Sequence, residues 1–223
     1  MLPLSLSRDP LLPLNLLCLG AHADDIEIGC GGTLLQLLAS RPGVQVVWVV
    51  FSGAAGEREA EARASASLFL RQAARQKVLV MNFRDGHFPY QGSEIKDSLE
   101  ALKKDMAEPD LIFTHCREDR HQDHRTLSDL TWNTWRRQTI LEYEIPKYDG
   151  DLGAPNCFVP LSRAIGERKV QHILDVFGSE RHKAWMTGDT FEALMRLRGV
   201  ECAAPQGWAE AFHGRKLVLE AGA

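Results

Sequence analysis

Short, mostly apolar segments recur along the first half of the chain, and they constrain its fold more than any other feature. Four of them stand out: residues 14–19, 44–51, 78–81 and 111–114. Strands buried on both faces of a parallel sheet have near-continuous apolar sequences, whereas strands with one solvated face alternate apolar and polar residues. We therefore predict that these segments are strands of a parallel sheet.

Longer amphipathic segments separate the apolar ones and are predicted to be helices. They cover residues 32–40, 57–76, 94–107 and 124–137. In the second segment Ala62, Ala66 and Phe69 recur at three- and four-residue intervals, which is typical of a helix with one buried stripe. Alternating strands and helices favour right-handed crossover connections. We expect an α/β fold, with one domain over residues 1–223 and a mostly parallel sheet in a Rossmann-like three-layer sandwich.

The second half of the chain has a less regular pattern. Residues 140–145 are predicted to form a strand, and residues 146–155 form a turn-rich loop. Residues 163–177 and 185–197 have helical periodicity, and residues 216–219 are predicted to be a last short strand.

The composition limits the class of protein. The 223 residues are 44% hydrophobic and 25% charged, as in a soluble globular domain. The formal net charge is -4 and both signs are interspersed, so we expect no nucleic-acid partner and no polybasic membrane contact. Because no stretch of about 18 apolar residues exists, we expect no membrane span.

Cysteine usage and the N-terminal stretch indicate the compartment. The five cysteines lack Cys-x-x-Cys spacing, which argues against a structural zinc site, and their odd number predicts reduced thiols. Residues 1–19 are rich in leucine but are interrupted by prolines, unlike a signal peptide. We therefore expect a cytoplasmic protein. The sequence leaves a homo-oligomer open.

The first segment with candidate catalytic and metal-binding residues is residues 20–25, Gly-Ala-His-Ala-Asp-Asp, directly after the first predicted strand. In open parallel sheets, sites form at these carboxyl ends of strands. His22 and Asp25 offer a nitrogen and an oxygen ligand, both of which zinc accepts. Asp24 is then free to act as a base on a metal-bound water. The alternative is a helix cap, because an Asp side chain accepts hydrogen bonds from free backbone amides.

The second segment is residues 121–124, His-Gln-Asp-His, which again follows a predicted strand and precedes a helix. His121 and His124 are three residues apart, so they can face the same way at a helix start. Asp123 can orient an imidazole by accepting its second ring proton. Alone this is a weak signal, and His121 would equally fit a packed core. Together the two segments predict an open catalytic zinc site with three protein ligands and a water.

At this point the chain resembles the LmbE-like, or PIG-L-like, family of zinc-dependent N-deacetylases. That family carries Ala-His-Pro-Asp-Asp after its first strand and His-x-Asp-His after a later one, matching residues 21–25 and 121–124. Ala23 stands where the family usually has proline, which removes a restriction on the turn but no ligand. Further similarity runs through residues 26–33, 58–70, 83–86, 143–160 and 209–212, nearly the whole chain.

The resemblance implies a reaction and a role for each motif residue. One zinc ion per chain is expected on three ligands: His22, Asp25 and His124. Asp24 is then the general base, His121 helps to stabilise the oxyanion, and Asp123 tunes His121. The implied reaction removes an N-acetyl group from an amino sugar of the N-acetylglucosamine type, or from its conjugate, by metal-activated water. The implied partner is a small N-acetylated sugar.

Arg58 and Asp85 are the candidate substrate-binding residues. The family keeps an arginine near position 58, where it would hold substrate hydroxyls or a phosphate. The alternative for Arg58 is a solvated helix residue among neighbouring glutamates. Asp85 precedes a glycine, so it fits a sugar-hydroxyl contact and a simple turn equally well.

Three other functions compete with the deacetylase. A nucleotide-binding module is disfavoured because Leu34 stands where a Gly-x-Gly-x-x-Gly loop needs its last glycine. A mononuclear or binuclear metal-dependent phosphoesterase, acting on a sugar or nucleotide, is the main alternative. Two-metal sites need more bridging carboxylates than these motifs supply. A non-catalytic metal-binding protein would have no need for a free base such as Asp24.

Overall fold

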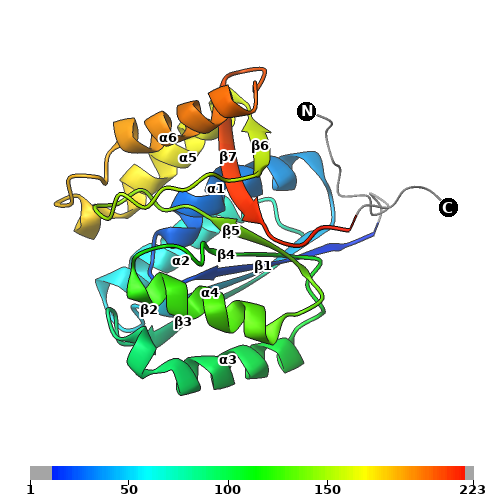
Figure 1. Ribbon diagram of the computed structural model, residues 1–223, viewed down its shortest axis with the longest axis vertical. Coiled ribbons are helices and arrows are strands. Elements are labelled where there is room, and N and C mark those ends of the chain that lie inside the picture. Colours follow the sequence, from blue (N-terminus) through cyan, green and yellow to red (C-terminus); the bar gives the residue numbers. More distant parts are fainter. Residues whose placement is uncertain (1–11, 219–223) are drawn as a thin grey trace.

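A computed structural model describes residues 12–218, which form one seven-stranded sheet flanked by helices (Figure 1). The sheet order is β3-β2-β1-β4-β5-β7-β6. Its strands are β1 (Leu14–Gly20), β2 (Val44–Ser52), β3 (Arg75–Phe83), β4 (Leu111–His115), β5 (Thr139–Tyr143), β6 (Cys157–Leu161) and β7 (Trp208–Gly214). The first five are parallel, and β7 is antiparallel to both β5 and β6.

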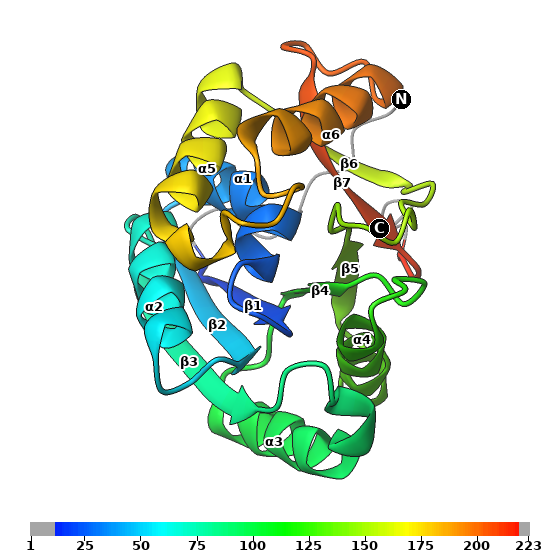
Figure 2. The ribbon, with the colours of Figure 1, turned by 90° about the vertical axis from the view of Figure 1, so that its left-hand side faces the viewer.

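Six α-helices and two short 3₁₀ turns are seen in the described part of the chain. The helices are α1 (Asp25–Ser40), α2 (Glu57–Phe69), α3 (Gly92–Asp105), α4 (Gln122–Thr134), α5 (Arg163–Val176) and α6 (Gly188–Glu201). The 3₁₀ turns are η1 (Phe88–Tyr90) and η2 (Gly178–Glu180). Helices α1, α2 and α5 cover one face of the sheet, and α3 and α4 cover the other (Figure 2). None of these helices is long and apolar enough to cross a membrane.

Strand β2 illustrates why the central parallel strands are mostly apolar. Successive side chains of a strand point to opposite faces of the sheet. Trp48 packs with Phe69 of α2 in one core, whereas Phe51 packs with Leu99 of α3 in the other. Since both faces are covered, few polar side chains occur on either side of the strand. The predicted α/β fold with a mostly parallel sheet is therefore confirmed.

Several boundaries in the first half differ from the prediction. The helix predicted over residues 57–76 ends at Phe69, and β3 begins at Arg75 rather than at residue 78. Strand β3 lies at the edge of the sheet and its first residues are exposed, so their polar side chains concealed the strand. Helix α1 begins at Asp25, seven residues before its predicted start at residue 32. Its glycines allow close packing, since a Cβ on Gly29 would lie 2.2 Å from the Tyr143 ring.

The second half of the chain contains the larger errors. Strands β6 and β7 were not predicted, and helix α6 begins at Gly188 instead of residue 185. The helix predicted over residues 163–177 is confirmed as α5. The strand predicted at residues 216–219 is wrong over 216–218, which have no regular structure, and Leu219 lies outside the described residues. Residues 1–11 and 219–223 of the expected domain also lie outside them.

Candidate active site

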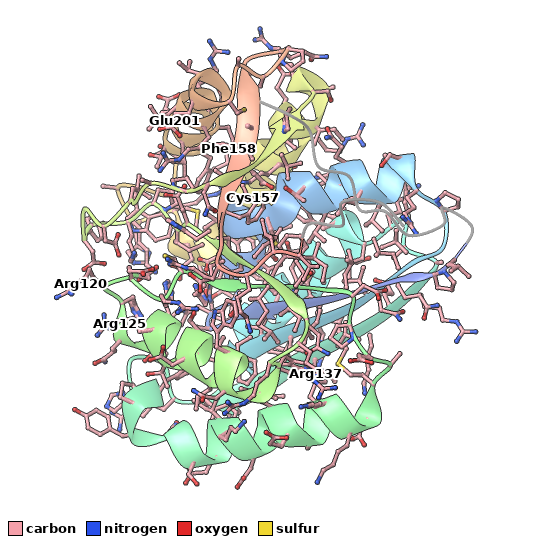
Figure 3. All side chains as sticks on the ribbon, turned by 45° about the vertical axis from the view of Figure 1, so that its right-hand side comes forward. Arg120, Arg125, Arg137, Cys157, Phe158 and Glu201 are labelled. Carbon is pink, nitrogen blue, oxygen red and sulfur yellow. The ribbon has the colours of Figure 1, made fainter. Side chains whose placement is uncertain are left out.

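Two neighbouring strand ends bring the two predicted motifs together. Strands β1 and β4 are paired in parallel, and α1 and α4 begin just after them (Figure 2). The backbone N–H of Ala21 donates to Nε2 of His115, 3.0 Å away, which joins the two strand ends. In Figure 3, Arg120 and Arg125 mark this end of α4, and Arg137 lies beyond its opposite end. The motifs therefore meet where the sheet topology predicts.

The three predicted metal ligands converge. Nδ1 of His22 lies 3.2 Å from Nε2 of His124 and 3.3 Å from Oδ2 of Asp25. Nε2 of His124 lies 3.4 Å from Oδ1 of Asp25. Ligand atoms of a tetrahedral zinc ion, with bonds near 2.1 Å, are about 3.4 Å apart. The two nitrogens and the Asp25 carboxylate, whose Oδ2 faces His22 and whose Oδ1 faces His124, have spacings that fit the ligands of a zinc ion with one position left open.

The protonation state of His124 suits a ligand. Burial lowers the pKa of His124 to about 3, with the nearby His115 adding to the effect. Its ring is therefore neutral near pH 7, and Nδ1 faces Oδ2 of Asp119 at 2.9 Å. A neutral imidazole whose Nδ1–H donates to a carboxylate keeps its Nε2 lone pair for a cation.

Asp24 has an unusual backbone conformation and a side chain that does not cap the helix it precedes. Its φ is 136°, in the left-handed region that non-glycine residues seldom adopt, at a cost of about 1–3 kcal/mol. It stands at the N-cap of α1, yet its side chain makes no capping hydrogen bond, so the helix-cap alternative is wrong for this residue. Burial and the adjacent Asp25 raise the pKa of Asp24 to about 7, against the effect of Arg58.

His121 and Asp123 both lie at the site, in different relations from those expected. His121 is the N-cap of α4 and half-buried, and its Nδ1 accepts from the Asp123 backbone N–H at 3.3 Å. The buried Asp123 carboxylate lies 3.2 Å from Nε2 of His22 and accepts from the N–H groups of Gly86 and Phe88. A role of Asp123 in tuning His121 therefore stays a prediction.

The two candidate substrate residues flank the site. Oδ1 of Asp85 lies 3.0 Å from Nε2 of His22, and the Asp85 side chain is 75% exposed. The guanidinium of Arg58 lies 3.3 Å from Asp24 and 3.0 Å from Glu61, and it also contacts Glu180. Arg58 is thus an ion-pair partner of the candidate base. Substrate binding by either residue stays a prediction.

Two residues at the site escaped the sequence analysis. The ring of His115 stacks on that of His124 with centroids 3.9 Å apart, and its Nε2 lies 3.2 Å from Asp25. Asp119 holds His124, as described above, and also accepts from the backbone N–H of His121 at 2.7 Å. His115 ends β4 and Asp119 lies two residues before His121, so their position after a strand was an available signal.

The comparison with known families bears on this geometry. A sequence model of the PIG-L family, described as GlcNAc-PI de-N-acetylase, matches residues 17–135, more than half of the chain. The chain belongs to the PIG-L family of deacetylases. The match runs from β1 to the end of α4 and includes both motifs. In this PIG-L-family chain, strands β5 to β7 and helices α5 and α6 lie outside the match.

A curated relative agrees with this assignment, and solved structures share the fold. The PIG-L-family chain is 31% identical over 143 residues to the Escherichia coli K12 protein described as uncharacterized deacetylase YaiS, covering 59% of this chain and 74% of that protein. The N,N'-diacetylchitobiose deacetylase of Pyrococcus horikoshii matches with a TM-score of 0.67 and 22% identity over 89% of this chain and 82% of that one.

A solved structure with a different activity also shares the fold. The 4-carboxy-2-hydroxymuconate hydratase GalB of Pseudomonas putida KT2440 matches with a TM-score of 0.74 and 15% identity, over 94% of this chain and 99% of that one. At such identities both structural likenesses show the fold alone. Because one fold hosts different reactions, the reaction has to be argued from the site.

Proposed function

We propose that this chain is a zinc-dependent hydrolase that removes the N-acetyl group of an amino sugar of the N-acetylglucosamine type, or of its conjugate. The observation that carries the proposal is the convergence of His22, Asp25 and His124: the two ring nitrogens lie 3.2 Å apart, and each lies 3.3 or 3.4 Å from one oxygen of the Asp25 carboxylate. Membership of the deacetylase family and the sugar named for the Pyrococcus horikoshii structure support the substrate class.

The proposed mechanism assigns proton transfer to Asp24. His22, Asp25 and His124 would hold the zinc ion, which would supply a Lewis acid and would lower the pKa of a water molecule to near neutrality. Asp24 is buried beside the ligand Asp25, where its carboxylate takes a proton from the attacking water. The same carboxyl then returns the proton to the leaving amine. Arg58, 3.3 Å away, holds the carboxylate in place.

His121 is the candidate donor to the developing oxyanion. Its Nδ1 accepts from the Asp123 backbone N–H, so the proton of the neutral ring is on Nε2. That N–H is free to donate to the carbonyl oxygen as negative charge develops there. Its ring lies edge-on to the ring of His22, with centroids 4.9 Å apart, which keeps it beside the proposed ligands.

A binuclear phosphoesterase remains the rival reaction, and a second donor set bears on it. Besides two sets that share His124 with the proposed ligands, His22, Asp85 and Asp123 also lie close enough to hold a cation. This set shares His22 with the first, and both oxygens of Asp123 already accept backbone N–H groups. One ion per chain therefore fits the donors better than two, and one ion favours the deacetylase.

The first experiment is metal content by mass spectrometry on the wild type and on His124→Ala, with His172→Ala as a control histidine on α5. We expect about one zinc per chain in the wild type and control, and a loss in His124→Ala. Acetate release from N-acetylated sugars and N-acetylglucosamine conjugates then tests the reaction. A wild type without metal after zinc is supplied would overturn the proposal, and two metals per chain would favour the phosphoesterase.

A further inference from the structure

The segment that joins β5 to β6, residues 144–156, lies outside the family match and buries a lysine against the candidate site. We call it the β5–β6 loop. The side chain of Lys147 is only 8% exposed. Its Nζ lies 2.6 Å from Asp151, 3.0 Å from Asp119 and 4.0 Å from Asp149. The ammonium group therefore bridges carboxylates of the loop and of the segment after β4.

Asp119 carries this contact on to the proposed ligand. Its Oδ1 lies against Lys147 and also accepts from the N–H of His121, while its Oδ2 accepts from Nδ1 of His124. The Asp119 side chain is only 3% exposed, so water does not replace any of these partners. Two contacts thus lead from Lys147 to an atom of the ring that offers Nε2 to the metal.

Removing the ammonium group would leave Asp119 and Asp151 close together without a cation. Their side chains are 3% and 6% exposed, and an unpaired buried carboxylate is strongly unfavourable. Rotation of the Asp119 carboxylate away from this position would relieve that cost. The rotation moves the acceptor that fixes the His124 tautomer and ring orientation, and such partners typically contribute about 10–100-fold to metal affinity.

The loop is fastened firmly enough to transmit such a change. Arg198 of α6 binds Glu144 through two nitrogens at 2.6 and 2.9 Å, and it also donates to the carbonyl oxygen of Gly153. At the other side, Asp151 accepts from the backbone N–H of Arg120 at 2.7 Å. The loop is thus tied to α6 and to the segment between β4 and α4, which fixes the position of Lys147 within it.

We propose that Lys147 is a positioning residue for the zinc site, which couples the β5–β6 loop to His124 through Asp119. The inference rests on the proposed function, since it needs His124 to be a metal ligand. It gives the β5–β6 loop a role in metal binding, although neither sequence motif lies in that loop. Zinc affinity in this chain then depends on the fold of its second half.

The test measures the zinc dissociation constant by competition with a chromogenic chelator, on metal-free protein whose folding is checked by circular dichroism. Lys147→Met removes the charge and keeps an apolar side chain, and Lys147→Arg keeps the charge. Lys169→Met is the matched control, because Lys169 is also buried against a carboxylate, Glu210, but contacts none of the proposed ligands. If Lys147→Met does not fold, Lys147→Gln takes its place.

We expect Lys147→Met to bind zinc about 10–100-fold more weakly than the wild type. Lys147→Arg and Lys169→Met should stay within a few-fold of the wild type. Equal zinc affinity in Lys147→Met and the wild type would overturn this inference and leave the proposed function standing. Equal weakening in Lys169→Met would also overturn it, because a general loss of packing would then be the cause. A wild type that binds no zinc would overturn both.

Discussion

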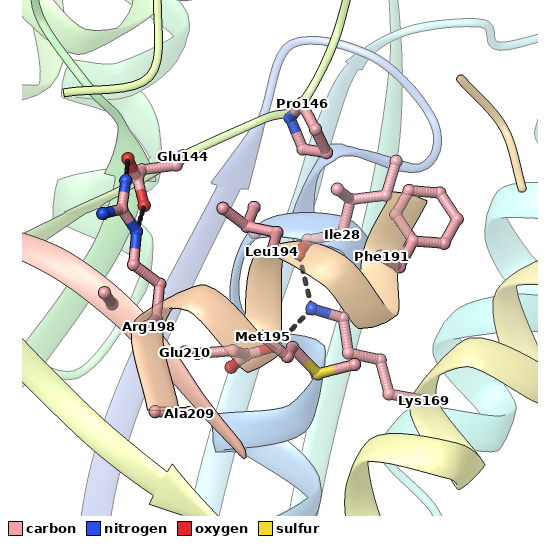
Figure 4. A pocket seen from close by; sticks show the side chains of 12 residues that line it. Ile28, Glu144, Pro146, Lys169, Phe191, Leu194, Met195, Arg198, Ala209 and Glu210 are labelled. Carbon is pink, nitrogen blue, oxygen red and sulfur yellow. Dashed lines mark hydrogen bonds and ion pairs between the residues drawn. The ribbon is translucent and has the colours of Figure 1, made fainter. Parts of the chain in front are cut away.

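Two clusters of buried charge contain the same kind of ion pair, one beside the proposed metal site and the other away from it. In each, a buried lysine pairs with a buried carboxylate: Lys147 with Asp119, and Lys169 with Glu210. Figure 4 shows the Lys169 amine between the Ile28 carbonyl and Glu210. We call the first the metal-side cluster (His22, Asp24, Asp25, Asp119, His124, Lys147) and the second the helix-side cluster (Lys169, Glu210).

The difference lies in what the shared carboxylate holds besides the lysine. Asp119 holds the ring of His124, whereas Glu210 accepts from the backbone N–H groups of Gly32 and Thr33 inside α1. The metal-side cluster therefore ends on a group that can bind an ion. The helix-side cluster ends on the backbone of a helix. The same ion pair is thus expected to control metal binding in one place and stability in the other.

The largest effect is expected from the base of the metal-side cluster. Asp24→Asn keeps the size of the side chain but cannot take a proton, so kcat should fall by about 10²–10⁴-fold, as is typical for a general base. Zinc content should stay near the wild-type value, because Asp24 is not one of the three converging donors. Turnover measured as acetate release, beside metal content, checks both statements. Near-normal turnover would remove Asp24 from this role.

The motifs and the central strands were predictable because their signals are local. Residues 14–19 and 44–51 are apolar except for Asn15 and Gln45, and each chemical motif lies within a few residues of a strand end. The edge strand β3 was harder, since one exposed side admits Arg75 and Lys77. Strand β7 was missed because Glu210 and His213 are polar, although both are buried in the fold.

The buried roles of Glu210 and Lys147 also escaped the sequence analysis, because each depends on partners in another segment of the chain. Glu210 is satisfied by residues of α1 that lie 177 and 178 positions earlier in the chain. Lys147 is buried against Asp119, which comes from another segment of the chain. No local pattern records such pairings, since a lysine in a polar turn has the same sequence whether it is solvated or buried. The helix start at Asp25 was concealed for a related reason, because Gly29 packs against Tyr143.

The second-largest effect is expected in the helix-side cluster, where a substitution should lower stability. In Lys169→Met the Glu210 carboxylate loses its cation inside the core, and breaking a buried pair in this way costs about 3–5 kcal/mol. The two backbone donors to Glu210 remain, so a loss near the lower end is expected. Urea unfolding of the metal-free protein measures the free energy of unfolding. No loss of stability would show that the helix-side pair contributes nothing.

Removing the metal should lower the free energy of unfolding through the metal-side cluster alone. A ligand that binds only the folded state stabilises it by about 2.7 kcal/mol at a free concentration of 100 times its dissociation constant. Chelation should lower the free energy of unfolding by the same amount in the wild type and in Lys169→Met. At that zinc concentration chelation should lower the free energy of unfolding of Lys147→Met by a smaller amount, because less of this variant binds zinc. Equal losses in all three proteins would contradict the division between the clusters.

The smallest effect distinguishes the two carboxylates that Lys147 joins. Asp119→Asn keeps an acceptor for Nδ1 of His124 but removes the negative charge, so zinc affinity should fall by about 10–100-fold. Asp151→Asn removes the loop carboxylate, which contacts Lys147 and the Arg120 backbone but not His124. Its zinc affinity should change less than that of Asp119→Asn. If both variants weaken zinc binding equally, the coupling runs through the position of the whole β5–β6 loop rather than through the Asp119 carboxylate.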